Sequence, residues 1–153
     1  MKSLADDLAT ENASIALYPE AIETLTALRC AGVKIGLCSN LAAPYAEPVL
    51  RLLPFVFDAY AWSFQVGAVK PDPKMYSFVC EALQTNPKEV LMVGDTFEED
   101  FLGPRRAGMQ SVFLDRALQS PGTDTVSSLS EVMNIFRVDI AKIQVPSSGV
   151  LPK

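Results

Sequence analysis

The stretch MVGDTFEEDFLGPRRAGM, residues 92–109, places four carboxylates directly behind an apolar run. The run predicts a buried strand, and Asp95 is the first residue past it, followed closely by Glu98, Glu99 and Asp100. Like charges at this density repel one another, so a positive group must compensate them. A metal ion is the best candidate for that group, because hard cations bind carboxylate oxygens. The stretch therefore predicts a polar site at the end of a strand.

The rest of the chain alternates strand patterns with helix patterns. Apolar, β-rich segments predict strands over residues 33–38, 57–64, 90–93 and 110–115. Helical spacing and end signals predict helices over residues 18–32, 43–53 (interrupted by Pro48), 74–83, 98–109 and 127–136. This alternation predicts an α/β fold, with a Rossmann-like parallel sheet covered by helices on both faces. We expect a linker or cap remnant over residues 1–17, the core over 18–136 and a tail over 137–153.

Composition excludes several classes of function. The 153 residues carry a net charge of −5 with scattered lysines and arginines, which disfavours nucleic-acid and anionic-membrane partners. The chain has no histidine, which excludes Ser-His-Asp triads, Cys-His pairs and histidine zinc sites. Cys30, Cys38 and Cys80 lack CxxC spacing, and the N-terminus lacks an apolar signal core. Both features predict a cytoplasmic protein with buried, reduced thiols.

Three polar groups are expected at one edge of the sheet. Ser39 and Asn40 follow the strand 33–38, Lys70 lies in the loop motif KPDP, and Asp95 and Asp100 follow the strand 90–93. Ligands bind open parallel sheets beyond the carboxyl ends of the strands, where these residues should meet. Each group alone also has a structural explanation: a turn or cap, a solvated loop lysine, and acids that favour a helix N-terminus.

The order and spacing of the three groups add a further indication. The segments LYPEAIETLTALRCAGVKIGLCSN, VKPDPKMYSFV and VLMVGDTFEEDFLGPRRAGM occur in this order within residues 18–136. Together they resemble the C-terminal part of the core domain of the haloacid-dehalogenase-like (HAD) hydrolase superfamily, whose members are mostly phosphatases. The resemblance implies Mg²⁺-dependent hydrolysis of a small phosphorylated metabolite.

The resemblance also implies a role for each site residue. Ser39 would donate a hydrogen bond to a phosphoryl oxygen, and Asn40 would add further donors. Lys70 would neutralise the phosphoryl group and the catalytic carboxylate. Asp95 would help to hold Mg²⁺, and Asp100 would support the metal or orient Lys70. These roles are chemically sensible, because Mg²⁺ takes oxygen ligands and phosphoryl transfer needs positive charge around the phosphoryl oxygens.

The remaining charges of the opening stretch have expected roles as well. Glu98 and Glu99 should favour the N-terminus of the following helix, and Arg105 and Arg106 should be solvated or paired with acids. Many relatives have alanine where this chain has Pro104. Because proline is tolerated only in a first helical turn, we expect the helix to begin near Gly103 or with an irregular turn.

The aspartate nucleophile of the superfamily, found in a DxDx[TV] motif after the central strand, is not expected in this chain. The segment LADDLAT, with Asp6, Asp7 and Thr10, has no apolar strand before it and a leucine where the second aspartate belongs. Little or no turnover is therefore expected from this chain alone. The alternatives are a phosphate- and Mg²⁺-binding module without turnover and a degenerate scaffold.

The same absence would leave a position open in the sheet. The missing strand would lie between residues 33–38 and 90–93. These two strands should then pair directly, or another segment should fill the position. The candidates are the N-terminal arm, the tail FRVDIAKIQV and a strand from a second copy of the chain, so a homodimer is one expected form.

Overall fold

The computed structural model describes residues 3–120 and 122–136, and over these residues helices alternate with strands. The strands are β1 (Gly36–Ser39), β2 (Ala59–Trp62), β3 (Leu91–Gly94), β4 (Gln110–Leu114) and β5 (Thr125–Val126). The α-helices are α1 (Leu4–Ser14), α2 (Ala21–Cys30), α3 (Ala43–Leu52), α4 (Ser63–Val66), α5 (Pro73–Leu83) and α6 (Gly103–Arg106). Short helical turns are η1 (Pro87–Glu89), η2 (Phe97–Leu102) and η3 (Leu129–Glu131), and helical backbone continues over 132–136. The predicted α/β class is confirmed.

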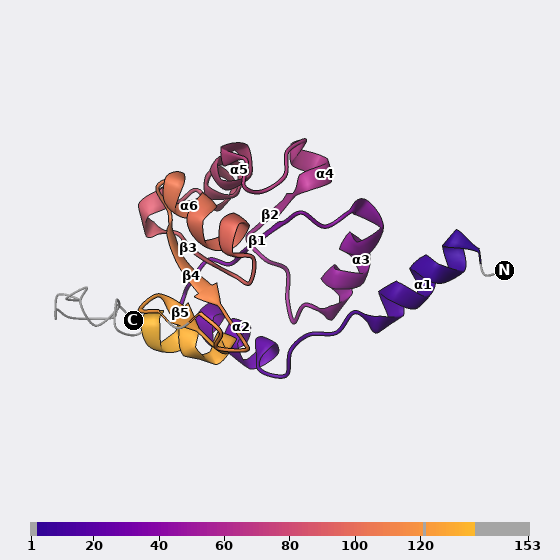
Figure 1. The fold of residues 1–153 in the computed structure, drawn as a ribbon, viewed down its shortest axis with the longest axis horizontal. Coiled ribbons are helices and arrows are strands. Elements are labelled where there is room, and N and C mark those ends of the chain that lie inside the picture. Colours follow the sequence, from indigo (N-terminus) through magenta and orange to yellow (C-terminus); the bar gives the residue numbers. More distant parts are fainter. Residues whose placement is uncertain (1–2, 121, 137–153) are drawn as a thin grey trace, which may run out of the picture.

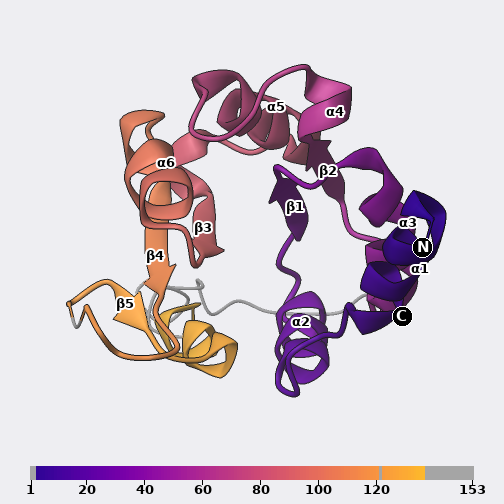
Figure 2. The same cartoon turned by 45° about the vertical axis from the view of Figure 1, so that its right-hand side comes forward.

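The strands form two separate parallel sheets. β1 pairs with β2 in the register Gly36↔Ala59, and β4 lies between β3 and β5 in the other sheet. Within the described ranges, β1 and β3 are not paired with each other, and Figure 2 shows the two sheets apart, with α5 lying between them at the top. We call them the β1–β2 half and the β3–β4–β5 half.

Helix α5 packs against both halves and forms the larger hydrophobic cluster with them. Its Met75 and Tyr76 are 0% and 1% exposed. The cluster contains Ala59 and Ala61 of β2, and Met92 of β3 packs at its margin. The helix starts where the sequence predicts, because Asp72 accepts a hydrogen bond from the N–H of Lys74 and Pro73 occupies the first turn.

On the face turned away from α5, each half has its own group of packed side chains. Tyr60 and Trp62 alternate with the alanines of β2, so they lie on the face away from α5. With Phe57 they form a row of stacked rings whose neighbouring centroids are 6.0 Å apart. In the other half the buried aliphatic cluster consists of Val112, Leu114, Val126 and Val132.

The position between β1 and β3 is closed neither by direct pairing of the two strands nor by the N-terminal arm, the two expectations that the described residues can test. The two strands do not pair directly. The N-terminal arm forms α1, which projects from the body of the molecule (Figure 1) and contacts α3 through a hydrogen bond from the Tyr45 hydroxyl to Glu11. The tail candidate FRVDIAKIQV lies, apart from its first residue, outside the described residues.

Two further expectations need correction. Pro48 does not interrupt the helix, because α3 runs through it. Its missing N–H would have reached the carbonyl of Pro44, in the first turn, so only one hydrogen bond is lost. Cys30 is exposed rather than buried, whereas Cys80 is buried and Cys38 partly so. Among the helices that the structure describes, none is both long and apolar enough to cross a membrane.

Candidate functional site

The Asn40 side chain, just past the end of β1, makes three hydrogen bonds. Its Oδ1 accepts from the backbone N–H of Lys70 at 2.7 Å. Its Nδ2 donates to the backbone carbonyl of Lys70 and to Oε2 of Glu99, both at 3.1 Å. The preceding Ser39 accepts a hydrogen bond from the N–H of Leu41 at 3.1 Å, which leaves its hydroxyl hydrogen free to donate. The end of β1 therefore holds the main chain of Lys70.

Lys70 is buried, with 8% of its surface exposed, and its ammonium donates to Oδ1 of Asp100 at 2.5 Å. Asp100 is also buried, and its Oδ2 accepts from the N–H of Thr96 at 3.1 Å. A buried ion pair of this kind needs such additional hydrogen bonds to offset desolvation. The structure thus brings together residues 30 positions apart, and Lys70 lies against Asp100 as one of the two expected roles of Asp100 requires.

The structure explains why a glycine precedes Asp95. A Cβ on Gly94 would lie 2.3 Å from Cγ of Asp100, so a larger residue would collide with that carboxylate. Asp95 itself is exposed at the C-terminal end of β3. We call Asn40, Lys70, Glu99 and Asp100 the polar cluster; Ser39 and Asp95 adjoin it along the chain.

The segment after Asp95 begins with an irregular turn, as the position of Pro104 predicts. Residues Phe97–Leu102 form a π-helical turn, and α6 begins at Gly103 with Pro104 in its first turn. Gly103 is required here because a Cβ would lie 2.2 Å from the Tyr76 hydroxyl. That hydroxyl donates to the carbonyl of Glu99 at 2.6 Å, so α5 fixes the turn. The expected late start of the helix is confirmed.

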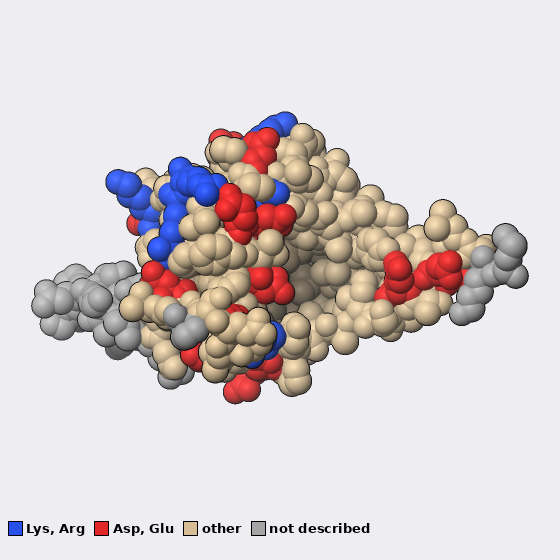
Figure 3. Space-filling model, viewed as in Figure 1, with Lys and Arg blue, Asp and Glu red and all other residues tan. Residues whose placement is uncertain are grey.

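The two arginines of the opening stretch form ion pairs at the surface. Arg106 pairs with Glu98 of the same stretch, as expected, whereas Arg105 pairs with Asp124, an acid outside the stretch, at 2.7 Å. In Figure 3 basic side chains gather on the side of the molecule that carries α6, with acidic side chains next to them. Glu99 differs from its neighbour Glu98, because its carboxylate turns to Asn40.

The described residues contain no group of three or more acidic, cysteine or histidine side chains arranged to hold a metal ion. The donors beside the cluster nevertheless suit Mg²⁺, which commonly takes one or two carboxylates and completes its shell with water and substrate phosphate. Asp95 supplies one exposed carboxylate of this kind. Asp100 is a weaker candidate, since each of its oxygens already accepts a hydrogen bond.

Two other potential nucleophiles are unsuited to the chemistry. Burial raises the pKa of the Cys38 thiol to about 11, so it stays protonated at neutral pH. Asp6 lies in the first turn of α1, where its carboxylate accepts hydrogen bonds from the N–H and hydroxyl of Ser3, and these bonds lower its pKa. It belongs to a capping box rather than to a site.

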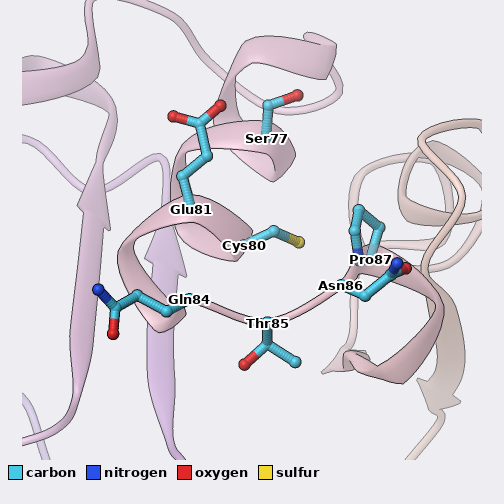
Figure 4. Close-up of a pocket in the computed structure, with 7 residues that line it drawn as sticks. All are labelled: Ser77, Cys80, Glu81, Gln84, Thr85, Asn86 and Pro87. Carbon is cyan, nitrogen blue, oxygen red and sulfur yellow. The ribbon is translucent and has the colours of Figure 1, made fainter.

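Sequence reasoning assigned Glu99 to the helix N-terminus and assigned no role to Tyr76. The KPDP motif predicts the start of α5, but the hydrogen bond from the Tyr76 hydroxyl depends on how α5 packs against the π-helical turn. The pocket drawn in Figure 4 lies elsewhere, at the C-terminal end of α5, where Cys80, Gln84 and Thr85 are among its lining residues. It contains none of the predicted site residues.

Comparisons with known proteins place this geometry in context. A family model described as haloacid dehalogenase-like hydrolase matches residues 4–108. A glyceraldehyde 3-phosphate phosphatase of Methanopyrus kandleri is 36% identical over 109 residues, which are 70% of this chain and 47% of that protein. The (S)-2-haloacid dehalogenase 4A of Burkholderia cepacia is 30% identical over 149 residues, 92% of this chain and 64% of that protein.

A solved structure is similar as well. The crystal structure of a HAD phosphatase from Thermococcus onnurineus matches with a TM-score of 0.76 and 27% identity, covering 88% of this chain and 65% of that one. The chain thus spans about half to two thirds of the length of these relatives.

Proposed function

The chain belongs to the haloacid dehalogenase-like hydrolase family, and from this premise we propose that its polar cluster binds the phosphoryl group of a small phosphorylated metabolite. The proposed ancestral reaction is phosphoester hydrolysis of the phosphatase type. The observation that carries this proposal is the buried Lys70, whose ammonium pairs with Asp100 while Asn40, just past the end of β1, holds its backbone. A fixed positive charge at the carboxyl ends of parallel strands suits a phosphoryl dianion.

Each neighbouring group has a definite task in this proposal. The Lys70 ammonium has three N–H donors and attracts the phosphoryl oxygens. The Ser39 hydroxyl donates to one of those oxygens, because its own oxygen already accepts from the N–H of Leu41. Asp100 keeps Lys70 in place and, as an anion beside the ammonium, moderates its charge when no ligand is present.

Magnesium is part of the proposal through Asp95. Its exposed carboxylate would hold Mg²⁺ together with water and a substrate oxygen. When bound, Mg²⁺ would neutralise negative charge on the phosphoryl group. Asp95 is the residue of the opening stretch best placed for this task, since Glu98 pairs with Arg106 and Glu99 with Asn40.

Turnover by this chain alone is proposed to be slow or absent. Two carboxylates of the polar cluster are engaged in hydrogen bonds, Glu99 with Asn40 and Asp100 with Lys70 and Thr96. Removing the nucleophile from a well-studied hydrolase costs about a million-fold in rate. This engagement favours the second candidate function, a module that binds phosphate and Mg²⁺ without hydrolysis.

The test measures binding and turnover on the same protein. Calorimetry with inorganic phosphate, with and without Mg²⁺, measures binding, and release of phosphate from an aryl phosphate measures turnover. Asp95→Ala should abolish the Mg²⁺ dependence of both quantities. Asp7→Ala, an exposed acid on α1, serves as the matched control and should change neither.

The outcomes separate the candidates. Mg²⁺-dependent turnover that Asp95→Ala abolishes identifies an enzyme. Phosphate binding without turnover identifies the binding module. If the wild-type chain binds no phosphate at millimolar concentration and releases none, both candidates are wrong.

A further inference from the structure

We propose that Glu99 is a positioning residue of this site: by holding the Asn40 amide, it fixes the peptide unit of Lys70 and thereby the ammonium that faces the phosphoryl group. The inference rests on the proposed function for the ligand, and on the hydrogen bonds of the structure for the geometry. It assigns Asn40 to the protein's own main chain, in place of the direct phosphate contact that the sequence suggests.

Every hydrogen-bonding group of the Asn40 side chain is engaged within the protein. An asparagine side chain has two N–H donors and one carbonyl oxygen. The structure directs the donors to the carbonyl of Lys70 and to Glu99, and the oxygen accepts from the N–H of Lys70. Asn40 thus binds both the N–H and the carbonyl of Lys70. Because both of its own N–H donors are engaged, it has none left for a phosphoryl oxygen.

The main chain of Glu99 is held by a hydrogen bond from α5. Its backbone carbonyl accepts from the hydroxyl of Tyr76, which is 1% exposed in α5. Asp72, at the start of the same helix, lies two residues after Lys70. Glu99 and Lys70 are therefore both attached to α5, Glu99 through the Tyr76 hydrogen bond and Lys70 through the chain. The hydrogen bond between Asn40 and Glu99 adds a second connection between the Lys70 loop and the π-helical turn.

The contacts of Asn40 and Lys70 also cross the gap between the sheets. β1 and β3 do not pair within the described residues, so ladder hydrogen bonds do not set the distance between the ends of these strands. The hydrogen bond from Asn40 to Glu99 and the ion pair of Lys70 with Asp100 connect the end of β1 and the Lys70 loop to the turn after β3. A loss of the first contact should loosen the Lys70 loop.

The test compares three variants of the full chain. Glu99→Ala removes the acceptor, and Glu99→Gln keeps an acceptor oxygen without the charge. Glu98→Ala is the matched control, because this adjacent acid pairs with Arg106 on the surface. The first measurement is amide hydrogen exchange by NMR at the Lys70 N–H, without ligand. The second is the affinity for inorganic phosphate in the presence of Mg²⁺.

We expect about tenfold faster exchange at Lys70 and about tenfold weaker phosphate binding in Glu99→Ala, the size that a lost hydrogen bond to a charged group implies. Glu98→Ala should stay within about twofold of wild type on both measurements, whereas Glu99→Gln, whose neutral oxygen accepts a weaker hydrogen bond, should lose about threefold.

Three results overturn the inference: unchanged exchange at Lys70 in Glu99→Ala, an equal acceleration over all of β1 and β3, and exchange at Lys70 that is as fast in Glu99→Gln as in Glu99→Ala. If exchange at Lys70 responds as expected but the wild-type chain binds no phosphate, the positioning stands and the proposed function fails.

Discussion

The two halves carry different side chains on the face that is turned away from α5, which we call the outer face. Along β2 of the β1–β2 half the filling is a row of stacked aromatic rings that includes Tyr60 and Trp62. In the β3–β4–β5 half it is a cluster of branched aliphatic residues that includes Val112 and Val132. The inner face differs from both, because α5 packs one continuous cluster against the two halves.

The difference raises the question of what holds the two sheets together. Each outer filling belongs to one half, so it cannot join the halves. Among the described residues, the contacts that join them include the cluster around α5, the ion pair of Lys70 with Asp100, the hydrogen bond from Asn40 to Glu99, and the hydrogen bonds of Glu20. Each contact can be removed separately, and the only tryptophan of the chain, Trp62, reports on the β1–β2 half by fluorescence.

Removal of the Lys70 charge should have the largest effect. Lys70→Met leaves the buried Asp100 carboxylate without its cation, and breaking a buried pair in this way costs about 3–5 kcal/mol. Urea unfolding should show this loss by Trp62 fluorescence and by far-UV circular dichroism.

Two further variants check the cause. The double variant Lys70→Met with Asp100→Leu should recover most of the loss, because no buried charge remains. Arg51→Met removes the cation of a pair whose side chains are both 74% exposed, and should change the free energy of unfolding by less than about 0.5 kcal/mol. A cost below about 1 kcal/mol for Lys70→Met would show that the pair does not join the halves.

Truncation of the shared cluster should come next in size. Met75 is 0% exposed in α5, and Met75→Ala should cost about 2–5 kcal/mol. Since the cluster spans both halves, fluorescence and circular dichroism should still change together. Val132→Ala lies in the aliphatic cluster of one half and should cost about 2 kcal/mol.

The exposed Val69→Ala, at 58% exposure, is the matched control and should have almost no effect. Coincident transitions in Met75→Ala would support one cooperative unit. A fluorescence transition that precedes the change in circular dichroism would instead show that the halves unfold separately.

Much of the site could be predicted because local rules determine it. Because β1 ends in Ser39 and β3 ends just before Asp95, the sequence correctly places these polar groups at the carboxyl ends of two parallel strands, although the strands lie in separate sheets. The resemblance to the superfamily implies that Asp100 supports the metal or orients Lys70, and the structure places the Lys70 ammonium against Asp100. Pro104 likewise predicts the irregular turn before α6, because proline is best accommodated in a first helical turn, even though α3 runs through Pro48.

The parts that could not be predicted depend on packing between distant segments. Glu98 and Glu99 are chemically identical neighbours, and only the π-helical turn decides which of them faces Asn40. The hydroxyl of Tyr76 finds the carbonyl of Glu99 because α5 crosses above that turn. Hydrophobic pattern could indicate the strands β1 and β3 but not their spacing, since periodicity carries no information on which edges pair.

The smallest predicted effect concerns Glu20, which precedes α2 and contacts the β3–β4–β5 half. Its Oε1 accepts from Arg116 at 2.8 Å and from the N–H of Leu129 at 3.3 Å. The Arg116 hydrogen bond is the main reason that its pKa falls from 4.5 to about 2. Because the folded-state pKa is lowered, the stabilisation is complete above about pH 4.5 and is lost as the pH falls toward 2.

Glu20→Gln should therefore lower the urea midpoint at pH 7 and leave it nearly unchanged near pH 2. The urea midpoint of the variant should then fall less than that of the wild type as the pH is lowered from 4.5 to 2. Asp58→Asn is the comparison within one half. Its carboxylate accepts from the N–H of Ile35 at 2.7 Å, which lowers its pKa, and it pairs with Arg29, so both partners precede β1. If Glu20 joins the halves, Glu20→Gln should separate the fluorescence and circular dichroism midpoints near neutral pH, whereas Asp58→Asn should move them together. Equal midpoints for both probes in both variants would show that Glu20 does not join the halves, and would leave that role to the cluster around α5, the Lys70 pair and the hydrogen bond from Asn40 to Glu99.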